Sequence, residues 1–583
     1  MRRLFALGDP RSLAAGVGAT DRLGTCTCPA VCRCRERRGE RRLMNGHPAL
    51  LNQRLAAALQ TGEDAPALVA AGTVISYRQL MVQVAATAAR LRTAEIGKGD
   101  RVAFQLPNCA DAVVLMLAAL MTGAVPVPML PAYRERELRH VLKATRPRVI
   151  ALTKGNRRFS AARVVTDFLR DENLDVALRL LDGSPGDEHA GWRDLGLFCS
   201  APADATAFSE CAAAEMLAED TAMMLLSSGT TGLPKAIARL NGGYSYMIAK
   251  ACRVFELSRQ SVYLAAMPIS HGFVINCPGM LGTLSCGGTV VLASDTSVQT
   301  ALELISAHGV THTTLVPALL TQWLEQSDDL PARPGTLQHV QVGGSRLSPD
   351  LAARAESKLG IRIQQCYGMS EGLLCFTRST DTDAVRFHSQ GRPLSEQDQV
   401  LIVDESGTPV PCGASGELIT RGPYTIKTYY NDPLASSRAF TPDGYYRTGD
   451  LAHLDADGNV YIDGRVTDSI NRGGEKFSPE ELEELSKGHA RLKDAACVGM
   501  ADPRFGEVAC LFAVAHEGEP LLLSDIRQYL ETAGVASFKL PEKLVLVDEI
   551  PRKGIGKIDR ALLRARVRDD AEGAGQASKA ALL

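Results

Sequence analysis

The hydrophobic pattern in the central part of the chain repeats an order of strand, helix and strand. Short apolar runs of strand length alternate there with longer stretches of helix length. The clearest units are 101–105, 110–121 and 125–129, then 313–316 with 318–325, and 339–342 with 349–358. Strands that alternate with helices predict an α/β domain with largely parallel sheets, whose ligands bind at the carboxyl ends of strands.

The pattern changes after about residue 400. Predicted strands at 400–403, 416–420 and 460–462 are short and separated by Gly and Asp turns, which indicates a β-rich subdomain at about 395–464. Residues 465–568 predict a small α+β domain. Its expected elements are an acidic helix at 479–487, strands at 496–500, 508–515 and 543–547, and a helix at 524–532. We therefore expect an α/β fold: a large N-terminal domain at 44–464 with mixed or parallel sheets, and a small mobile C-terminal domain.

Both ends of the chain lack the pattern of a packed unit. Residues 1–43 are rich in Arg and predict a disordered leader, and the first helix is expected at 48–59. Residues 569–583 predict a disordered tail. The leader contains a cysteine cluster at a spacing that a metal knuckle could use: Cys26, Cys28, Cys32 and Cys34. No histidine or second cysteine pair lies nearby, so metal binding there is the less favoured interpretation.

Composition narrows the function class. The 583 residues are 45% hydrophobic and 22% charged, which is typical of a soluble globular protein with two or more domains. A net charge of -2 and an aromatic content of 5% give no reason to expect nucleic acid or a membrane as partner. The longest apolar run, 110–130, is interrupted by Asp111, Pro126 and Pro128. Fifteen scattered cysteines fit a cytoplasmic protein, which we expect to be a monomer or homodimer.

The segment Ser227-Ser228-Gly229-Thr230-Thr231-Gly232-Leu233-Pro234-Lys235 carries the strongest chemical signal. It follows the apolar run 223–226, which predicts a buried strand, so the loop is expected at that strand's carboxyl end. Small hydroxyl residues, two glycines and a lysine suit a loop whose N–H groups and side chains surround phosphate oxygens. The spacing is not that of a P-loop. A solvated turn is the alternative interpretation.

Five further segments follow this loop in a fixed order. They are His271-Gly272-Phe273, Tyr367-Gly368-Met369-Ser370-Glu371, Tyr446-Arg447-Thr448-Gly449-Asp450, Gly464-Arg465 and Lys553-Gly554-Ile555-Gly556-Lys557. With these motifs the chain resembles the acyl-adenylating superfamily of AMP-forming ligases over roughly residues 50–565. The segments 421–425, 471–476 and 538–541 make it more similar to stand-alone aryl-acid adenylating enzymes of siderophore and nonribosomal peptide pathways, the 2,3-dihydroxybenzoate- and salicylate-AMP ligase type.

The resemblance implies ATP and Mg²⁺ as cofactors and assigns residues to them. Phosphate-binding residues would be Ser227, Gly229, Thr230, Thr231, Gly232 and Lys235, of which Thr231 and Lys235 would be catalytic. Glu371 would hold Mg²⁺, which prefers few carboxylates together with phosphate oxygens and water. Residues around adenine and ribose would be Gly343, Gly344, Ser345, Tyr367, Gly368, Met369, Asp450 and Arg465. Lys557 would bridge the substrate carboxylate and the α-phosphate. The alternative interpretations of these two residues are that Asp450 only closes a turn and that Lys557 is an ordinary surface lysine.

The resemblance also implies a pocket for an aromatic carboxylic acid. Its expected residues are His271, Gly272, Phe273, Asn276, Cys277, Gly343, Ser345, Cys366 and Leu374. Dihydroxybenzoate-activating relatives carry Asn at the position of Gly272 and Ser at that of Cys277. The absence of both groups disfavours 2,3-dihydroxybenzoate and favours salicylate or a larger or nitrogen-containing aryl acid. His271 could gate this pocket or be a buried structural histidine.

In the superfamily a thiol consumes the adenylate after the small domain rotates. The hinge is expected at 464–467, where Thr467 occupies a position at which Asp or Lys is more common. Gly473 and Gly474 would then line a pantetheine tunnel, and the acceptor would be an aryl carrier protein or, alternatively, coenzyme A. A non-catalytic nucleotide-binding protein is the remaining alternative, and Lys235, Glu371, Asp450 and Lys557 argue against it.

Overall fold

A computed structural model describes most of the chain. It covers residues 49–61, 64–155, 159–186, 189–201, 212–228, 233–326, 335–345, 347–465, 470–477, 479–516, 520–553, 557–560 and 562–568. The expectations for the leader, its cysteine cluster and the tail lie outside these ranges. Across the described ranges, no helix has both the length and the apolar character needed to cross a membrane.

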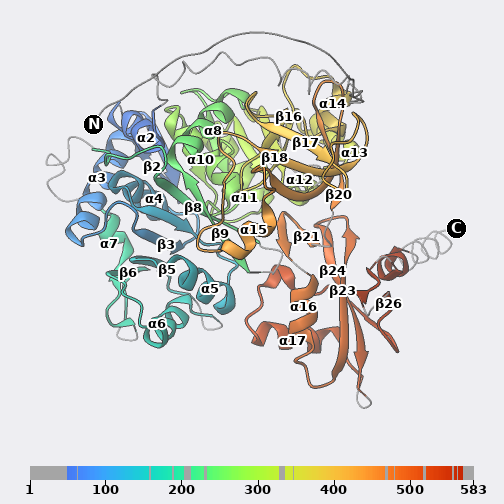
Figure 1. Ribbon diagram of the computed structural model, residues 1–583. Helices are drawn as coiled ribbons and strands as arrows, with labels where there is room; N and C mark the ends of the chain where they lie inside the picture. The colour runs from blue at the N-terminus through green and yellow to red at the C-terminus, as the bar shows by residue number, and fades with distance from the viewer. Residues whose placement is uncertain are drawn as a thin grey trace, which may run out of the picture.

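A nine-stranded sheet organises the large N-terminal domain (Figure 1). Its central strands are parallel, and antiparallel strands close both edges. In spatial order the strands are β16 (Arg392–Pro393), β15 (Leu374–Phe376), β14 (Arg362–Gly368), β13 (His339–Gly343), β12 (His312–Leu315), β10 (Val262–Ala265), β11 (Thr289–Leu292), β1 (Pro66–Ala70) and β2 (Thr73–Ser76). The strands expected at 313–316 and 339–342 are β12 and β13.

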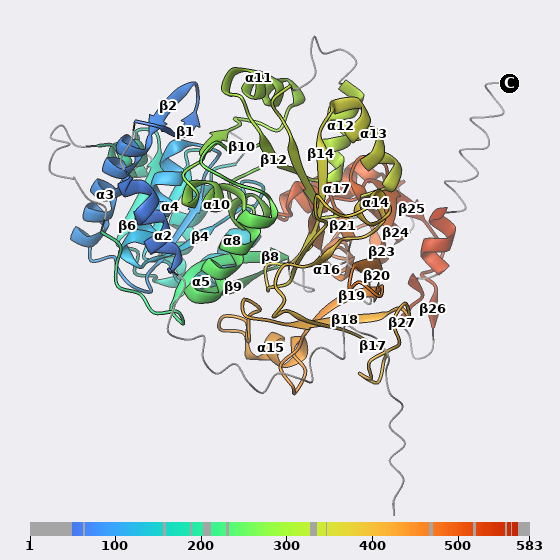
Figure 2. The ribbon, with the colours of Figure 1, turned by 90° about the horizontal axis from the view of Figure 1, so that it is seen from above.

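Helices cover both faces of this sheet (Figure 2). One face packs on α8 (Asn241–Val254) and α10 (Gly279–Ser285). The other face packs on α11 (Val298–His308), α12 (Pro317–Gln326) and α13 (Pro349–Leu359). Two short helices, α9 (Gly272–Asn276) and α14 (Asp383–His388), complete this half of the domain. The parallel α/β arrangement expected from the alternating pattern is confirmed.

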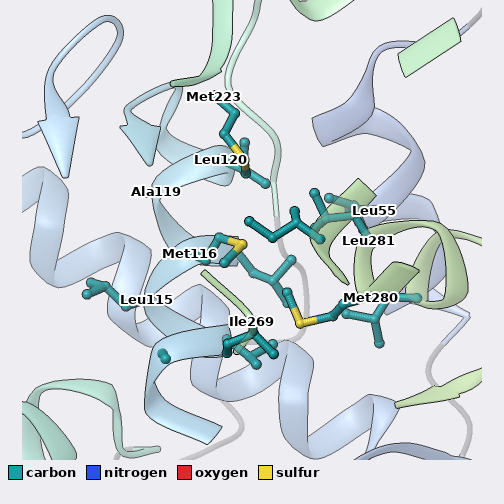
Figure 3. Packing of buried hydrophobic residues seen from close by; sticks show 14 of the residues in the cluster. Leu55, Leu115, Met116, Ala119, Leu120, Met223, Ile269, Met280 and Leu281 are labelled. Atoms are coloured by element: carbon teal, nitrogen blue, oxygen red, sulfur yellow. The ribbon is translucent and has the colours of Figure 1, made fainter. Parts of the chain in front are cut away.

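A second sheet contains five parallel strands: β4 (Val125–Pro128), β3 (Arg101–Gln105), β5 (Val149–Thr153), β6 (Leu178–Asp182) and β7 (Arg193–Asp194). Its helices are α2 (Leu51–Gln60), α3 (Tyr77–Thr93), α4 (Ala110–Thr122), α5 (Glu135–Thr145), α6 (Ala161–Glu172) and α7 (Leu195–Cys199). Buried residues of α4 share one core with strands of both sheets, and Figure 3 shows Leu115, Met116 and Leu120 in that packing. A helix enclosed on all sides needs apolar residues all round, which explains the long apolar run. Gly123 ends α4 in the left-handed conformation, with φ of 76°.

The strand expected at 223–226 is part of β8 (Thr221–Ser228), but it does not belong to a parallel sheet. Within the described part of the chain, β8 pairs antiparallel with β9 (Pro234–Leu240) in a two-stranded sheet. The glycine-rich loop therefore connects the two strands of a hairpin. The apolar run predicted the buried strand correctly. Whether that strand pairs parallel or antiparallel depends on β9, the strand after the loop, and the apolar run does not indicate this.

The β-rich subdomain is a four-stranded antiparallel sheet. Its strands are β17 (Gln399–Val403), β18 (Gly416–Arg421), β19 (Tyr446–Leu454) and β20 (Val460–Arg465), and α15 (Pro433–Ala439) lies between β18 and β19 in the chain. Three of these strands were expected at 400–403, 416–420 and 460–462. The fourth, β19, carries Asp450 and was recognised as a motif rather than as a strand.

The small C-terminal domain is built on one mixed sheet with helices beside it. Its strands are β21 (Ile470–Arg472), β22 (Glu475–Phe477), β23 (Leu492–Asp502), β24 (Gly506–Ala515) and β25 (Lys543–Leu546), and its helices are α16 (Pro479–Ser486), α17 (Leu523–Thr532) and the 3₁₀ turn Ser537–Lys539. β23 is longer than the expected 496–500 because it pairs with β24 over its whole length. A separate hairpin of β26 (Arg552–Lys553) and β27 (Lys557–Ile558) follows.

Candidate active site

One cavity of about 230 Å³ lies where the sheets of the large domain meet the small domain. The lining residues of the large domain are Pro128, Leu130, Leu225, Leu226, Ser227, Lys235, Ser270, His271, Gly272, Phe273, Asn276, Cys277, Gly344, Cys366, Gly368, Met369, Ser370, Glu371, Leu374, Tyr429, Tyr446, Thr448 and Asp450. The small domain contributes Gly474, Glu475 and Lys476. Segments far apart in the sequence therefore share one hollow that combines charged and apolar walls.

Glu371 is the buried carboxylate of this cavity. Its Oε1 atom accepts hydrogen bonds from Ser227 Oγ at 3.2 Å and from the Tyr429 hydroxyl at 2.9 Å. The ring of Tyr429 also lies under Lys235, with 4.6 Å between Nζ and the ring centroid. Tyr429 thus contacts both the acidic and the basic residue that the sequence assigns to metal and phosphate.

Arg239 supports the same loop from inside the protein. Its buried guanidinium donates a hydrogen bond to the carbonyl oxygen of Ser370, the residue before Glu371. Burial lowers the pKa of Arg239, and the neighbouring charge of Glu371 opposes that shift. The contact fixes the backbone from which the Glu371 side chain projects.

Asp450 and Tyr367 meet at the junction of the large domain and its β subdomain. The Tyr367 hydroxyl donates to Asp450 Oδ2 at 2.7 Å, and the Asp450 N–H donates to Thr448 Oγ1 at 3.0 Å. Asp450 is buried on β19 and lines the cavity. A carboxylate oriented in this way is suited to accept hydrogen bonds from vicinal hydroxyls of a ligand.

The helix α9 forms an apolar section of the cavity. His271 caps its N-terminus, because Nδ1 accepts the N–H of Phe273 at 3.2 Å. Burial raises the pKa of the Cys277 thiol to about 12, so this group stays protonated and acts as an apolar wall. Cys366 on β14 lies in the same wall.

Gly343 stands directly behind this wall. A Cβ atom at position 343 would lie 2.4 Å from the carbonyl oxygen of Cys366 and 3.1 Å from Phe273 Cζ. Because a methyl group cannot approach a backbone oxygen so closely, only glycine allows β13 and the Phe273 ring to pack here.

The hairpin formed by β21 and β22 brings the small domain to the cavity. Asn471 Nδ2 donates to the carbonyl oxygen of Gly344 at 2.9 Å, and Gly474 lies against the same glycine. Glu475 Oε1 lies 3.8 Å from His271 Nε2, and burial raises the pKa of the Glu475 carboxyl. The hairpin of β26 and β27, whose second strand begins at Lys557, lies on the outer side of the small domain (Figure 1).

The structure gathers many of the expected site residues but not all of them. Fourteen expected residues line the cavity: Ser227, Lys235, His271, Gly272, Phe273, Asn276, Cys277, Gly344, Cys366, Gly368, Met369, Glu371, Leu374 and Asp450. Three others do not line it: Gly343, Ser345 and Tyr367. The side chains of Arg465 and Lys557 lie outside the described part of the structure. The remaining expectations, for Gly229, Thr230, Thr231, Gly232 and Thr467, lie outside the described residues.

Sequence reasoning assigned no role to four residues at the charged part of the site. Tyr429 belongs to no motif, and Arg239 lies in a strand whose pattern is apolar. Tyr446 and Thr448 were part of a recognised segment, but neither received a role. The sequence around Tyr429 gives no sign of a role in the site, because only the fold brings this tyrosine to Glu371.

Comparison with known families identifies the chain. Residues 55–430 match the family described as AMP-binding enzyme, and residues 481–557 match the AMP-binding enzyme C-terminal domain. The first match alone covers more than half of the chain.

Curated relatives and solved structures agree with this match. A 2-hydroxy-7-methoxy-5-methyl-1-naphthoate–CoA ligase of Streptomyces carzinostaticus is 42% identical over 88% of this chain and 92% of its own length. The salicyl-AMP ligase / salicyl-S-ArCP synthetase of Mycobacterium tuberculosis is 38% identical, with 84% and 85% covered. The apo structure of MbtA from Mycobacterium smegmatis is 36% identical and superposes with a TM-score of 0.66 over 89% of this chain and 94% of that one. The chain therefore belongs to the family of AMP-binding enzymes, as an AMP-forming ligase of the aryl-acid adenylating kind.

Proposed function

We propose that this protein joins an aromatic carboxylic acid to AMP and then transfers the acyl group to the phosphopantetheine thiol of an aryl carrier protein. The observation that carries the proposal is the single cavity in which Lys235, Glu371 and Asp450 lie together with the apolar wall of Phe273 and Cys277. The charged side chains suit a nucleoside triphosphate and its metal ion, and the apolar wall suits an aromatic ring.

In the first half-reaction a carboxylate oxygen attacks the α-phosphorus of ATP and pyrophosphate leaves. The barrier depends on neutralising phosphate charge, a role that we assign to Lys235 and, in a second domain orientation, to Lys557. Asp450 holds the ribose hydroxyls in this proposal. Lys557 reaches the carboxylate only after the small domain rotates, because in the structure the β21–β22 hairpin occupies the cavity mouth instead.

The residues around Glu371 fit a magnesium ion. The two hydrogen bonds that the structure shows on this carboxylate both go to Oε1. A buried carboxylate such as Glu371, beside the lysine assigned to phosphate, is a donor that Mg²⁺ complements with phosphate oxygens and water. When bound there, the ion would supply charge neutralisation to the leaving pyrophosphate.

In the second half-reaction a thiolate attacks the acyl carbon and AMP leaves. The observed orientation of the small domain supports this step, since Gly474 lies against Gly344 beside the cavity. Glycines at this point leave room for a thin pantetheine arm. Coenzyme A is the second candidate acceptor, because two relatives that are 42% and 41% identical are named for CoA.

We infer that the acid is not 2,3-dihydroxybenzoate. Gly272 and Cys277 provide neither the amide nor the hydroxyl that would pair with two ring hydroxyl groups, and an unpaired buried polar group costs about 1–3 kcal/mol. Salicylate or a larger or nitrogen-containing aryl acid fits the apolar wall better, and relatives at 42% and 41% identity are named for a naphthoate and for salicylate.

Two measurements test the proposal. Pyrophosphate exchange with a panel of benzoic, naphthoic, picolinic and quinoline acids should show ATP-dependent turnover with at least one aryl acid, and more with salicylate or a bicyclic acid than with 2,3-dihydroxybenzoate. Acyl transfer should then be compared between coenzyme A and a purified holo aryl carrier protein. Failure of exchange with every acid contradicts the adenylation step, whereas transfer to coenzyme A alone contradicts only the carrier protein.

A further inference from the structure

A buried amide in the cavity wall lacks a hydrogen-bond partner. Asn276 ends α9, is 4% exposed, and lines the cavity. Its Oδ1 atom has no partner among the described residues. A buried oxygen without a partner has lost its hydration and gained no hydrogen bond, so this wall suits a ligand that supplies the missing donor.

The space in front of this oxygen is created by a glycine one helical turn earlier. A Cβ atom at Gly272 would lie 3.6 Å from Asn276 Oδ1, 3.7 Å from Leu225 Cδ1 and 3.7 Å from Ser370 Oγ, with no closer atom. These are ordinary van der Waals distances, so a group of methyl size fits there without displacing its neighbours. The volume that a side chain at position 272 would fill therefore opens onto the unpaired amide.

This space borders the residue that precedes Glu371, and in the proposed function it would face the carboxylate side of the acid. Ser370, which borders it, directly precedes Glu371, and Glu371 belongs to the charged part of the cavity. The reacting carboxylate must lie next to the phosphates, so the ring position nearest this space is the one adjacent to the carboxylate.

Apart from the hydroxyl groups of Ser270 and Ser370, the neighbouring side chains of this wall offer no strong acceptor. Phe273 and Leu374 are apolar, and burial raises the pKa values of both the Cys277 and the Cys366 thiols, which leaves them as weak hydrogen-bonding groups. Ser270 Oγ is also buried without a partner among the described residues, and it provides an internal comparison for the test below.

We propose that Asn276 is the residue that selects the ortho substituent of the acid, by accepting a hydrogen bond from a hydroxyl or amino group next to the carboxylate. This inference rests on the proposed function. It assigns recognition of the ortho group to Asn276 at the end of α9, because position 272 at the start of the helix is glycine here. The substrate class is then an ortho-hydroxy or ortho-amino aryl or heteroaryl acid.

The test compares acids that differ only in whether the ortho group can donate. Pairs of equal shape are salicylate with 2-methylbenzoate, 2-hydroxy-1-naphthoate with 2-methyl-1-naphthoate, and 3-hydroxypicolinate with 3-methylpicolinate. In pyrophosphate exchange the kcat/KM of the wild-type protein should favour the hydroxy acid of its best pair at least tenfold. Asn276→Leu, which keeps the branched shape of the side chain and removes its hydrogen-bonding atoms, should reduce that ratio to less than threefold while turnover of the methyl acid persists.

The controls separate this inference from the proposed function. Ser270→Ala should leave the hydroxy-to-methyl ratio within twofold of the wild type. A wild-type ratio near one overturns the inference without any variant, and so does a ratio that Asn276→Leu leaves unchanged. In both cases exchange with aryl acids still supports the adenylation step, whereas absence of exchange with every pair removes both proposals together.

Discussion

At the scale of single residues, Tyr429 connects the groups on which the chemistry of the site depends. Its hydroxyl donates to Glu371 at 2.9 Å and lies 3.2 Å from the hydroxyl of Tyr446, and its ring faces Lys235. Burial raises the pKa of Tyr429, and the Glu371 charge raises it further, so the hydroxyl stays a donor at any working pH. The orientation of the Glu371 carboxylate therefore depends on a residue outside every motif.

Removing this hydroxyl should weaken the metal site without removing the ring. For Tyr429→Phe we expect the Mg²⁺ concentration needed for half-maximal pyrophosphate exchange to rise about tenfold, the equivalent of roughly 1.4 kcal/mol for a lost hydrogen bond to a charged group. Measuring the pyrophosphate exchange rate at increasing Mg²⁺ concentrations gives this half-maximal concentration. Tyr430→Phe, one residue away and outside the cavity lining, is the matched control, and equal titration curves for both variants would contradict the role of Tyr429.

At the scale of elements, the parallel strands β12 and β13 bury a pair of histidines. His312 and His339 are register partners, with stacked rings whose centroids lie 4.7 Å apart, and Phe255 meets His312 edge to face. Burial, followed by the charge of His339, lowers the pKa of His312 to about 3, while Thr311 Oγ1 lies 2.7 Å from its Nδ1. The sheet therefore holds His312 in its neutral form.

This pair predicts a loss of stability at mildly acidic pH. An unfolded His312 binds a proton below about pH 6.5, whereas the folded one does so only near pH 3, so the unfolded state gains protons as the pH falls. The contribution of His312 to the free energy of unfolding is complete above about pH 6.5. Below that pH it decreases by up to roughly 1.4 kcal/mol per pH unit. Thermal unfolding at pH 7.5, 6.0 and 5.0 should show a shallower decline for His312→Gln than for wild type. His388→Gln, at a helix end, should decline like the wild type.

At the scale of the whole molecule, a buried cluster of charges joins the two domains. Lys539 of the small domain is 1% exposed and lies 3.2 Å from Glu137 on α5 and 3.2 Å from Glu481 on α16. Arg136 of the large domain also pairs with Glu481. Breaking such a buried set by removing one partner costs about 3–5 kcal/mol, so the cluster favours the observed domain orientation.

Lys539→Met should therefore separate the two half-reactions. In the proposed mechanism adenylation uses the rotated domain and acyl transfer uses the observed orientation. We therefore expect pyrophosphate exchange to stay within about threefold of wild type and acyl transfer to the thiol acceptor to fall at least tenfold. Single-turnover assays of each step measure this. Arg527→Met removes an ion pair to Glu542 inside the small domain and should affect neither step selectively. An equal loss of both steps in Lys539→Met would mean that the cluster serves stability alone.

The sequence predicted much of the fold because its signals are local. An apolar run of helix length followed by Gly123 predicts where α4 ends, and short apolar runs predict β12, β13, β17 and β18 within one or two residues. Pairing is not local: the antiparallel hairpin of β8 and β9 and the full length of β23 depend on partner strands.

For the site, the sequence by itself determined which residue types are available: a lysine after a glycine-rich loop, a glutamate and an aspartate in recognised segments, and a glycine, Gly272, directly after His271. Only the tertiary structure decided that Tyr429 and Arg239 support Glu371, that Asn276 faces the space left by Gly272, and that residues 474–476 of the small domain lie at the cavity. The physical reason is that hydrogen bonds and burial depend on distances of a few ångströms between segments tens to hundreds of residues apart, and no periodicity or spacing encodes those distances.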